Sequence, residues 1–259
     1  MRFGICAPLG NLEAVTAAGY DYIEPPVTAL LQPEQPEAEV MPPLLARFAA
    51  SRLKPETFNL LLPGDLKVVG PETDPERQAH YLDTAFRRAN RLGGEIAVFG
   101  SGAARQVPDN WPEAEANRQI VAFLGRCGDA AQRHGMVVAI EPLNRAECNF
   151  INSVAEALAL AEEANHPAIA VLSDLYHIAQ GSQSYDETRD AARLLCHVHV
   201  AGLGRRAPAA DDHDFLTGYF AILKQIGYPG RISIEARWED LEAQAADALQ
   251  VLKQAWEAA

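Results

Sequence analysis

The sequence has few cysteines, too few basic residues to balance its acids, and no long apolar run. Its four cysteines, Cys6, Cys127, Cys148 and Cys196, contain no C-x-x-C pair, so they indicate reduced, buried thiols rather than a disulfide framework. No apolar segment is long enough to cross a bilayer. Residues 1–8 lack the apolar run and the cleavage site of a signal peptide. These absences predict a cytoplasmic protein with no membrane partner.

Basic residues are outnumbered, with 22 Lys and Arg against 35 Asp and Glu, which gives a formal net charge of -13. Proteins that bind nucleic acids neutralise phosphates with clustered Lys and Arg, and a strongly acidic surface repels such polyanions. We therefore expect no nucleic-acid partner. With 48% hydrophobic and 22% charged residues, the composition is that of an ordinary globular protein.

Strand-like and helix-like segments alternate eight times along the 259 residues. Their spacing of roughly 25 to 40 residues is typical of βα units. The predicted strands are 3–7, 22–25, 55–62, 95–99, 137–140, 169–174, 195–201 and 232–236. The length fits one (β/α)8 barrel, and no linker or change of composition divides the chain. The sequence therefore predicts a single (β/α)8 TIM barrel of the α/β class, with one domain over residues 1–259.

Capping residues and breakers set the predicted helices between these strands. We expect helices at 11–19, 44–53, 74–92, 113–134, 154–165, 185–194, 213–226 and 241–256. The Pro-rich segment 25–43 is expected to be a loop with little helix, and residues 100–102 are expected to form a flexible turn.

Four predicted strands end in a residue that can bind a metal, namely Glu141, Asp174, His199 and Glu235. An ionised carboxylate at the end of a buried strand is costly unless it meets a cation. In a barrel of this kind, the C-terminal ends of the strands form the active-site face. One shared metal site explains four such endings better than coincidence does.

Three carboxylates and one imidazole suit an octahedral divalent cation better than a closed structural zinc site, which would use thiolates. We expect one divalent metal ion, Mn²⁺ first, with Mg²⁺, Co²⁺ and Zn²⁺ as alternatives. Four protein ligands leave two positions for a carbonyl and an adjacent hydroxyl of a sugar. The metal would then act as a Lewis acid and stabilise an enediolate.

The chain resembles the xylose-isomerase-like barrel superfamily, and within it the sugar isomerases and ketose 3-epimerases of the tagatose/psicose 3-epimerase type. The resemblance covers nearly the whole chain, is strongest over 137–238, and includes residues 58–65 (FNLLLPGD). It implies a small-molecule sugar as substrate and a metal bound by the same four residues. It also implies substrate contacts at positions that match the family's spacings, namely Glu147, His177 and Arg205.

The resemblance further implies a mechanism. Glu141 and Glu235 would lie on opposite faces of the sugar, so that one removes the proton beside the carbonyl and the other returns it from the far side. In an isomerase the same proton would return to the neighbouring carbon. Because members of the family form dimers or tetramers, a homo-oligomer is an open alternative. Residues 206–214 depart from the family's Pro-Gly-x-Gly turn, which leaves the identity of the sugar open.

Other functions of the same superfamily remain alternatives. One is a lyase or dehydratase acting on an inosose or hydroxy-keto acid, and another is a non-catalytic sugar-binding barrel. An endonuclease IV-like nuclease is disfavoured, because residues 59–63 and 99–102 lack the histidines that its three-zinc cluster needs. Asp211 and His213 loosely match that enzyme's Asp-x-His motif, so a second metal at His177, Asp211 and His213 stays open.

Three further features lie outside this set of site residues. Glu24 is a fifth strand-terminal carboxylate that could bond to pocket hydroxyls or pair with an Arg. His197 shares a face with His199, since strand residues two apart point the same way, and is expected to be a hydrogen-bonded core histidine. The glycines and arginines of residues 202–206 could hold a phosphate, so a sugar phosphate is an open alternative.

Overall fold

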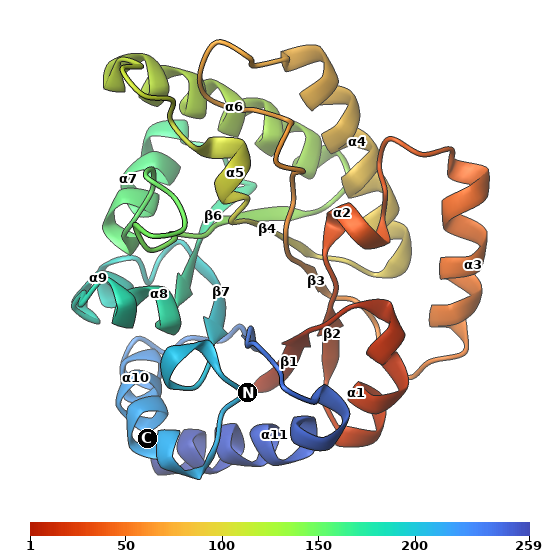
Figure 1. Ribbon diagram of the computed structural model, residues 1–259, viewed down its shortest axis with the longest axis vertical. Helices are drawn as coiled ribbons and strands as arrows, with labels where there is room; N and C mark the ends of the chain where they lie inside the picture. The colour runs from red at the N-terminus through yellow and green to blue at the C-terminus, as the bar shows by residue number, and fades with distance from the viewer.

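Eight short parallel strands surround one axis in the computed structural model, which describes residues 1–259 (Figure 1). They are β1 (Arg2–Cys6), β2 (Tyr22–Glu24), β3 (Thr57–Phe58), β4 (Ile96–Phe99), β5 (Val137–Ile140), β6 (Ile169–Asp174), β7 (Leu195–Val200) and β8 (Arg231–Ile234). Their order in the sheet is β2-β1-β8-β7-β6-β5-β4-β3. The Ile23 amide donates to the Lys54 carbonyl (3.2 Å) and the Val27 amide to the Asn59 carbonyl (2.8 Å), which joins β2 to β3. The predicted (β/α)8 barrel is confirmed.

Helices cover the outside of the barrel (Figure 1). They are α1 (Leu12–Ala18), α2 (Val27–Leu30), α3 (Glu37–Ala49), α4 (Pro75–Leu92), α5 (Gly102–Arg105), α6 (Glu113–Arg133), α7 (Val154–Ala164), α8 (Leu175–Gln180), α9 (Asp186–Asp190), α10 (His213–Gln225) and α11 (Leu241–Ala258). Short 3-10 turns lie at η1 (Leu9–Asn11), η2 (Leu203–Arg205) and η3 (Ala210–Asp212). None of these helices is both long and apolar enough to cross a membrane.

Local signals fix several helix ends as expected. The Asp74 side chain accepts a hydrogen bond from the Arg77 amide, Pro75 occupies the first turn of α4, and Gly93 ends the helix at φ 100°. Ser153 caps α7 by accepting from the Glu156 amide. These ends form because a cap satisfies amides that the helix leaves free, and because glycine enters the left-handed region without strain.

The prediction of a loop over residues 25–43 is wrong, because α3 begins at Glu37 and continues through Pro42 and Pro43. Both prolines face solvent, while the opposite side of the helix is buried through Val40, Met41, Leu44 and Phe48. A proline in a helix interior costs about 3 kcal/mol, so the two together cost about 6 kcal/mol. Burial of four apolar side chains, at roughly 1.5 to 3 kcal/mol each, contributes about 6 to 12 kcal/mol and offsets that cost.

Other boundaries also differ from the predictions. The third strand is two residues long, because Leu60 has a left-handed φ of 46° and ends the extended backbone early. Residues 102–105 form α5, which was not predicted and begins at the last residue of the turn expected at 100–102. The predicted helix at 185–194 is the shorter α9. The sequence reading also lacked α8, which starts because Asp174 Oδ1 accepts from the Tyr176 amide (2.6 Å) and the His177 amide (3.2 Å).

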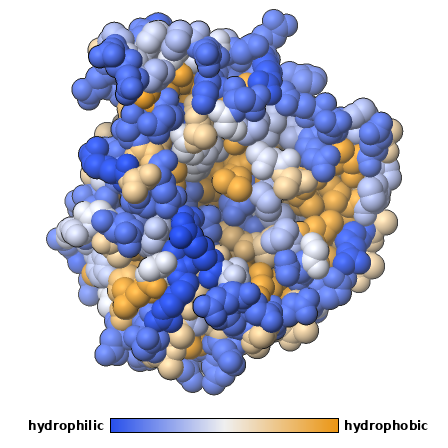
Figure 2. Space-filling model, in the orientation of Figure 1, coloured by the Kyte–Doolittle hydropathy of each residue, from blue (hydrophilic) through white to orange (hydrophobic).

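The N-terminal end of the barrel interior is filled. The Tyr22 side chain is fully buried and its hydroxyl lies 2.8 Å from Ser233 Oγ. Gly4 is required opposite it, because a Cβ there would lie 2.2 Å from the Tyr22 ring. Figure 2 shows a hollow in the middle of the viewed face, bordered by both polar and apolar side chains. The interior is therefore free for chemistry only at the C-terminal ends of the strands.

Candidate metal centre and active site

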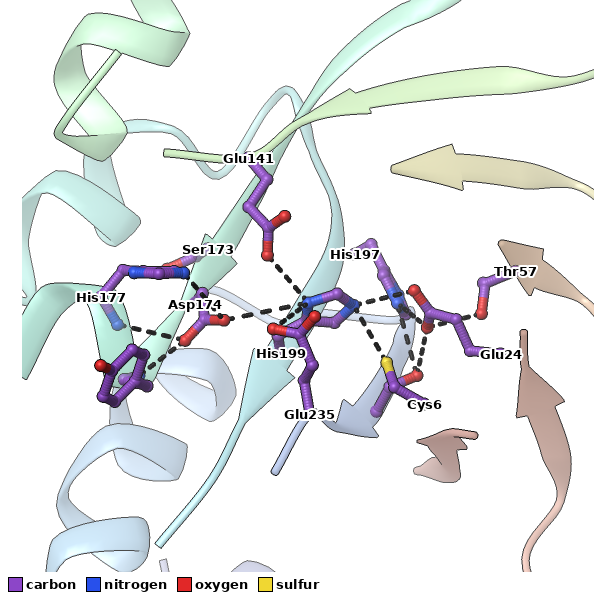
Figure 3. A network of polar contacts seen from close by, with 12 residues as sticks. Cys6, Glu24, Thr57, Glu141, Ser173, Asp174, His177, His197, His199 and Glu235 are labelled. Carbon is purple, nitrogen blue, oxygen red and sulfur yellow. Dashed lines mark hydrogen bonds and ion pairs between the residues drawn. The ribbon is translucent and has the colours of Figure 1, made fainter. Parts of the chain in front are cut away.

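Three carboxylates meet around one edge of the His199 imidazole (Figure 3). His199 Nδ1 lies 3.0 Å from Glu141 Oε1, 3.9 Å from Asp174 Oδ2 and 3.8 Å from Glu235 Oε2. Asp174 and His199 belong to β6 and β7, and Glu141 and Glu235 directly follow β5 and β8. The structure thus brings together the four residues predicted as ligands. That they bind a metal stays a prediction.

Backbone geometry places Glu141 in this cluster. Gly100 follows β4 beside it, and a Cβ at Gly100 would lie 2.1 Å from Glu141 Oε2. Arg105 is fully buried and donates from Nη1 to the Phe99 carbonyl (2.9 Å) and from Nη2 to the Glu141 carbonyl (2.7 Å). The absence of a side chain at Gly100 and the buried guanidinium of Arg105 therefore hold the ends of β4 and β5 in place.

A second histidine, His177, lies close to the same carboxylates, with Nε2 4.0 Å from Asp174 Oδ2. Its Nδ1 accepts hydrogen bonds from the Asn144 amide (3.0 Å) and from Asn144 Nδ2 (2.9 Å). Asn144 Oδ1 accepts from the Ala146 amide, which identifies the Asn144 nitrogen that faces His177. Because Nδ1 accepts, the proton of the neutral ring is on Nε2, which then has no lone pair for a metal.

Nε2 of His177 is buried and has no hydrogen-bond partner in the protein. A buried donor without a protein partner can be satisfied by a water or by a ligand atom. His177 therefore suits its predicted role as a substrate contact. His199 has the opposite arrangement, because its Nε2 lies 2.9 Å from Glu24 Oε1. An ionised carboxylate only accepts, so Nε2 carries a proton. Nδ1 faces Glu141 Oε1 at 3.0 Å in the same way, and a cation bound among the three carboxylates would take the place of the Nδ1 proton.

The charges of the cluster favour a cation. Burial and the neighbouring Glu141 carboxylate raise the pKa of Glu235 to about 7. Burial also acts to raise the pKa of Glu141, but the hydrogen bond and charge of His199 outweigh it and lower that pKa. Burial acts to lower the pKa of His199, but the Glu24 carboxylate holds it well above the usual value. In the metal-free cluster, protons on Glu235 and His199 thus provide the positive charge that a bound divalent cation would provide in their place. The donor set fits such an ion.

The other two predicted substrate contacts lie at the rim of the same cluster. Arg205 Nη1 lies 3.0 Å from Glu147 Oε1, and Arg205 Nη2 lies 2.6 Å from Glu235 Oε2. Asn144 Nδ2 also donates to Glu147 Oε1 (3.0 Å). The Arg205 guanidinium lies over the Tyr176 ring, 4.9 Å from its centroid. Tyr176 was not among the predicted site residues. Arg205 joins Glu147, a predicted substrate contact, to Glu235, a predicted catalytic residue.

The two open alternatives on the seventh loop find no support. Asp211 is exposed and pairs with Arg206 (2.8 Å), and His213 contacts Asp214. Neither belongs to a group of residues that could share a metal with His177. The Arg205 and Arg206 guanidinium groups are already paired with carboxylates, so this loop offers no free positive charge for a phosphate.

His197 is fully buried, and its Nε2 lies 2.8 Å from Glu24 Oε2. The expectation of a hydrogen-bonded core histidine is confirmed. Glu24 contacts no arginine and instead lies between His197 and His199 (Figure 3). Its position could have been predicted from polar residues that stand singly within otherwise apolar strands, such as Thr57 and Ser233.

Comparisons with known proteins agree on one family. A family model described as a xylose isomerase-like TIM barrel matches residues 12–255. An L-ribulose 3-epimerase of Methylomonas sp. (strain DH-1) is 30% identical over 230 residues, which is 85% of this chain and 74% of that enzyme. A crystal structure of D-allulose 3-epimerase from Methylomonas sp. has a TM-score of 0.80 and 25% identity, with 98% of each chain covered.

A ketose 3-epimerase of Arthrobacter globiformis is 34% identical over 116 residues, which is 44% of this chain. The match spans 40% of the length of that relative.

Proposed function

The chain belongs to the xylose isomerase-like TIM barrel family, and we propose that it is a divalent-metal-dependent sugar isomerase or epimerase that transfers a proton beside a ketose carbonyl. The observation that carries the proposal is the position of Glu141 and Glu235, whose carboxylates both lie within 4 Å of His199 Nδ1. The names of the epimerase relatives support this class of reaction and a small sugar as the substrate.

Glu141, Asp174, His199 and Glu235 would hold the metal, with Mn²⁺ as the first choice. The bound cation would act as a Lewis acid toward the carbonyl of the sugar and stabilise the negative charge that develops there. The four free cysteines fit a reducing compartment, which supports a cytoplasmic location.

The side chains of the protein perform the proton transfer. One of Glu141 and Glu235 removes the proton from the carbon beside the carbonyl, and the other delivers a proton to the opposite face, which inverts that carbon. His177 donates from Nε2 to a sugar oxygen, and Glu147 accepts from a hydroxyl. Arg205 contacts both Glu147 and Glu235, so it orients the delivering carboxylate relative to the bound sugar.

Hydrogen exchange with solvent tests this function. The enzyme is stripped with a chelator, reloaded with Mn²⁺ or Co²⁺, and incubated in deuterated water with free and phosphorylated ketopentoses and ketohexoses, including L-ribulose and D-allulose. We expect deuterium at the carbon beside the carbonyl, loss of this exchange after chelation, and recovery on reloading. Glu141→Gln and Glu235→Gln should each abolish epimerisation, since each removes one of the two carboxylates.

Exchange that survives complete metal removal would contradict the role of the cation. Failure of every sugar to exchange would contradict the proposed reaction. Loss of water, seen as a new conjugated absorbance, would assign the same site to a lyase or dehydratase instead.

A further inference from the structure

Glu24 is a buried carboxylate at the end of β2, on the side of His199 that faces away from the three predicted carboxylate ligands. Its side chain is fully buried. Oε1 lies 2.9 Å from His199 Nε2, and Oε2 lies 2.8 Å from His197 Nε2. Figure 3 shows the His199 ring between Glu24 on one edge and Glu141 on the other. The imidazole therefore connects two carboxylates that the strand ends hold apart.

Two hydroxyl groups complete the surroundings of Glu24. Thr57 Oγ1 donates to Oε2 (2.7 Å), and Ser233 Oγ donates to the same oxygen (2.5 Å). With the two histidines, this gives the carboxylate four hydrogen-bond donors. A buried charge is tolerated when hydrogen bonds replace its water. Glu24 is thus held in one orientation and has little capacity left to bind a sugar hydroxyl or a cation.

We propose that Glu24 is a positioning residue of the metal centre, which keeps the His199 proton on Nε2 and so turns the Nδ1 lone pair toward the cation. The proposal rests on the function proposed above. A carboxylate that accepts a hydrogen bond from the other ring nitrogen fixes the orientation and the tautomer of a metal-binding histidine and increases its basicity. Asp174, which faces Nδ1, is also held in one orientation, because its Oδ1 accepts hydrogen bonds from two amides of α8.

Two other roles for Glu24 compete with this one. Cys6, Glu24 and His199 offer ligand atoms within 4.8 Å of one another, which would suit a second cation. The Cys6 sulfur, however, lies 3.9 Å from His199 Nε2, the nitrogen that already donates to Glu24. Alternatively, Glu24 contributes only to stability. A second cation site predicts two metal equivalents per chain. A purely stabilising role predicts a metal affinity that does not depend on Glu24.

Metal affinity of the stripped full-length protein separates these roles without relying on turnover. We would titrate Mn²⁺ into wild type, Glu24→Gln and Glu24→Leu by calorimetry and by competition with a chromogenic chelator, and record the Co²⁺ absorption spectrum of each. Loss of a residue that holds a metal-binding histidine in this way typically weakens metal binding about 10- to 100-fold. We expect a loss of this size for both variants, larger for Leu, because Gln keeps an oxygen that can accept from Nε2. The Co²⁺ bands should shift as His199 reorients.

Glu56→Gln is the matched control. Glu56 is also a largely buried carboxylate of the barrel, but it pairs with Arg2 and Arg231 at the N-terminal ends of the strands. This variant should lower the melting temperature and leave Mn²⁺ affinity and the Co²⁺ spectrum at wild-type values. A purely structural role for Glu24 would give the same result as this control.

The outcomes are separable. One metal equivalent in wild type, with weaker binding and a shifted spectrum in Glu24→Gln, supports the proposal. Wild-type affinity in a folded Glu24→Gln overturns it, as does a second equivalent that Glu24→Gln alone abolishes. Should Glu24→Leu not fold, Glu24→Gln decides. A wild-type protein that binds no divalent cation overturns both this proposal and the metal-dependent function, whereas tight wild-type binding with an unaffected Glu24→Gln overturns only the role of Glu24.

Discussion

Removal of the charge of Glu235 should stabilise the metal-free protein at pH 8, although it abolishes catalysis. Burial and the Glu141 charge raise the pKa of Glu235 from 4.5 to about 7 in the folded state. In the unfolded chain the carboxyl loses its proton near its ordinary value. Between these pH values the folded state binds more protons than the unfolded state, so the free energy of unfolding falls as pH rises.

The size of the effect follows from the two pKa values. One pKa unit corresponds to about 1.4 kcal/mol, so ionising Glu235 in the fold costs about 3 kcal/mol above pH 7. Glutamine cannot ionise and avoids this cost. The attraction of Arg205, 2.6 Å away, is already included in this figure because it acts to lower the same pKa, and the figure takes Gln to fit the site as a protonated Glu does. For a chain of this size, 3 kcal/mol would raise the melting temperature by roughly 6 to 12 °C.

Chemical denaturation of the stripped proteins from pH 5 to pH 8 measures this difference. The stability gap between Glu235→Gln and wild type should be small at pH 5 and grow toward pH 8. Glu72→Gln is the control, because Glu72 is exposed and its replacement removes the same single charge from the net charge of -13. The control should show no gap that grows with pH.

Metal should reverse the order of stability. A ligand that binds only the folded state stabilises it by mass action, and wild type has one more carboxylate for the cation than Glu235→Gln. In saturating Mn²⁺ we expect wild type to be the more stable of the two. If the metal-free Glu235→Gln variant is no more stable than wild type at pH 8, the reasoning is refuted. The metal-free cluster would then not be destabilised by repulsion between its carboxylates.

Two further variants test how the site is built. Gly100→Ala should weaken Mn²⁺ binding and lower kcat at least tenfold, as measured by calorimetry and sugar turnover, because its Cβ would lie 2.1 Å from Glu141 Oε2; unchanged Mn²⁺ affinity would show that Glu141 can move aside at no cost. Asn144→Ala should raise KM for the sugar roughly tenfold or more while Mn²⁺ affinity stays at the wild-type value, because Asn144 holds His177 and Glu147 but contacts no predicted ligand through its side chain; an unchanged KM would remove both residues from substrate binding.

Most of the barrel could be predicted from sequence because its signals are local. Buried strands are runs of apolar residues, as at Val137–Ile140, and helix ends are marked by caps such as Asp74 and Ser153. The start of α3 could not be predicted in this way. Its prolines face solvent, and its first residue, Glu37, pairs with three arginines of α4, namely Arg87, Arg88 and Arg91. Those contacts are distant in sequence, and no local pattern reports them.

The clustering of the four predicted ligands also followed from sequence, because strand ends of a parallel barrel share one face. The separate roles of the two histidines did not follow. His177 and His199 both lie beside Asp174, and only the partners of their far nitrogens distinguish the predicted hydrogen-bond donor from the predicted metal ligand. Those partners are Asn144 on the loop after β5 and Glu24 at the end of β2, which are contacts that the three-dimensional fold creates.

Glu24-Pro25 and Glu141-Pro142 are the same dipeptide at the same place in a βα unit, yet the fold gives them opposite positions relative to His199. Glu24 faces Nε2, and Glu141 faces Nδ1. The sheet order β2-β1-β8-β7-β6-β5 places β2 and β5 on opposite sides of β7, so their carboxylates approach His199 from opposite edges. Only the Nδ1 edge faces Asp174 and Glu235, so Glu141 can share the proposed cation with them, while Glu24 would act on that cation only through the ring. Under the proposed function, the carboxylates that meet the Nδ1 edge of His199 would bind the cation, and the place of each strand in the barrel decides which edge its carboxylate meets.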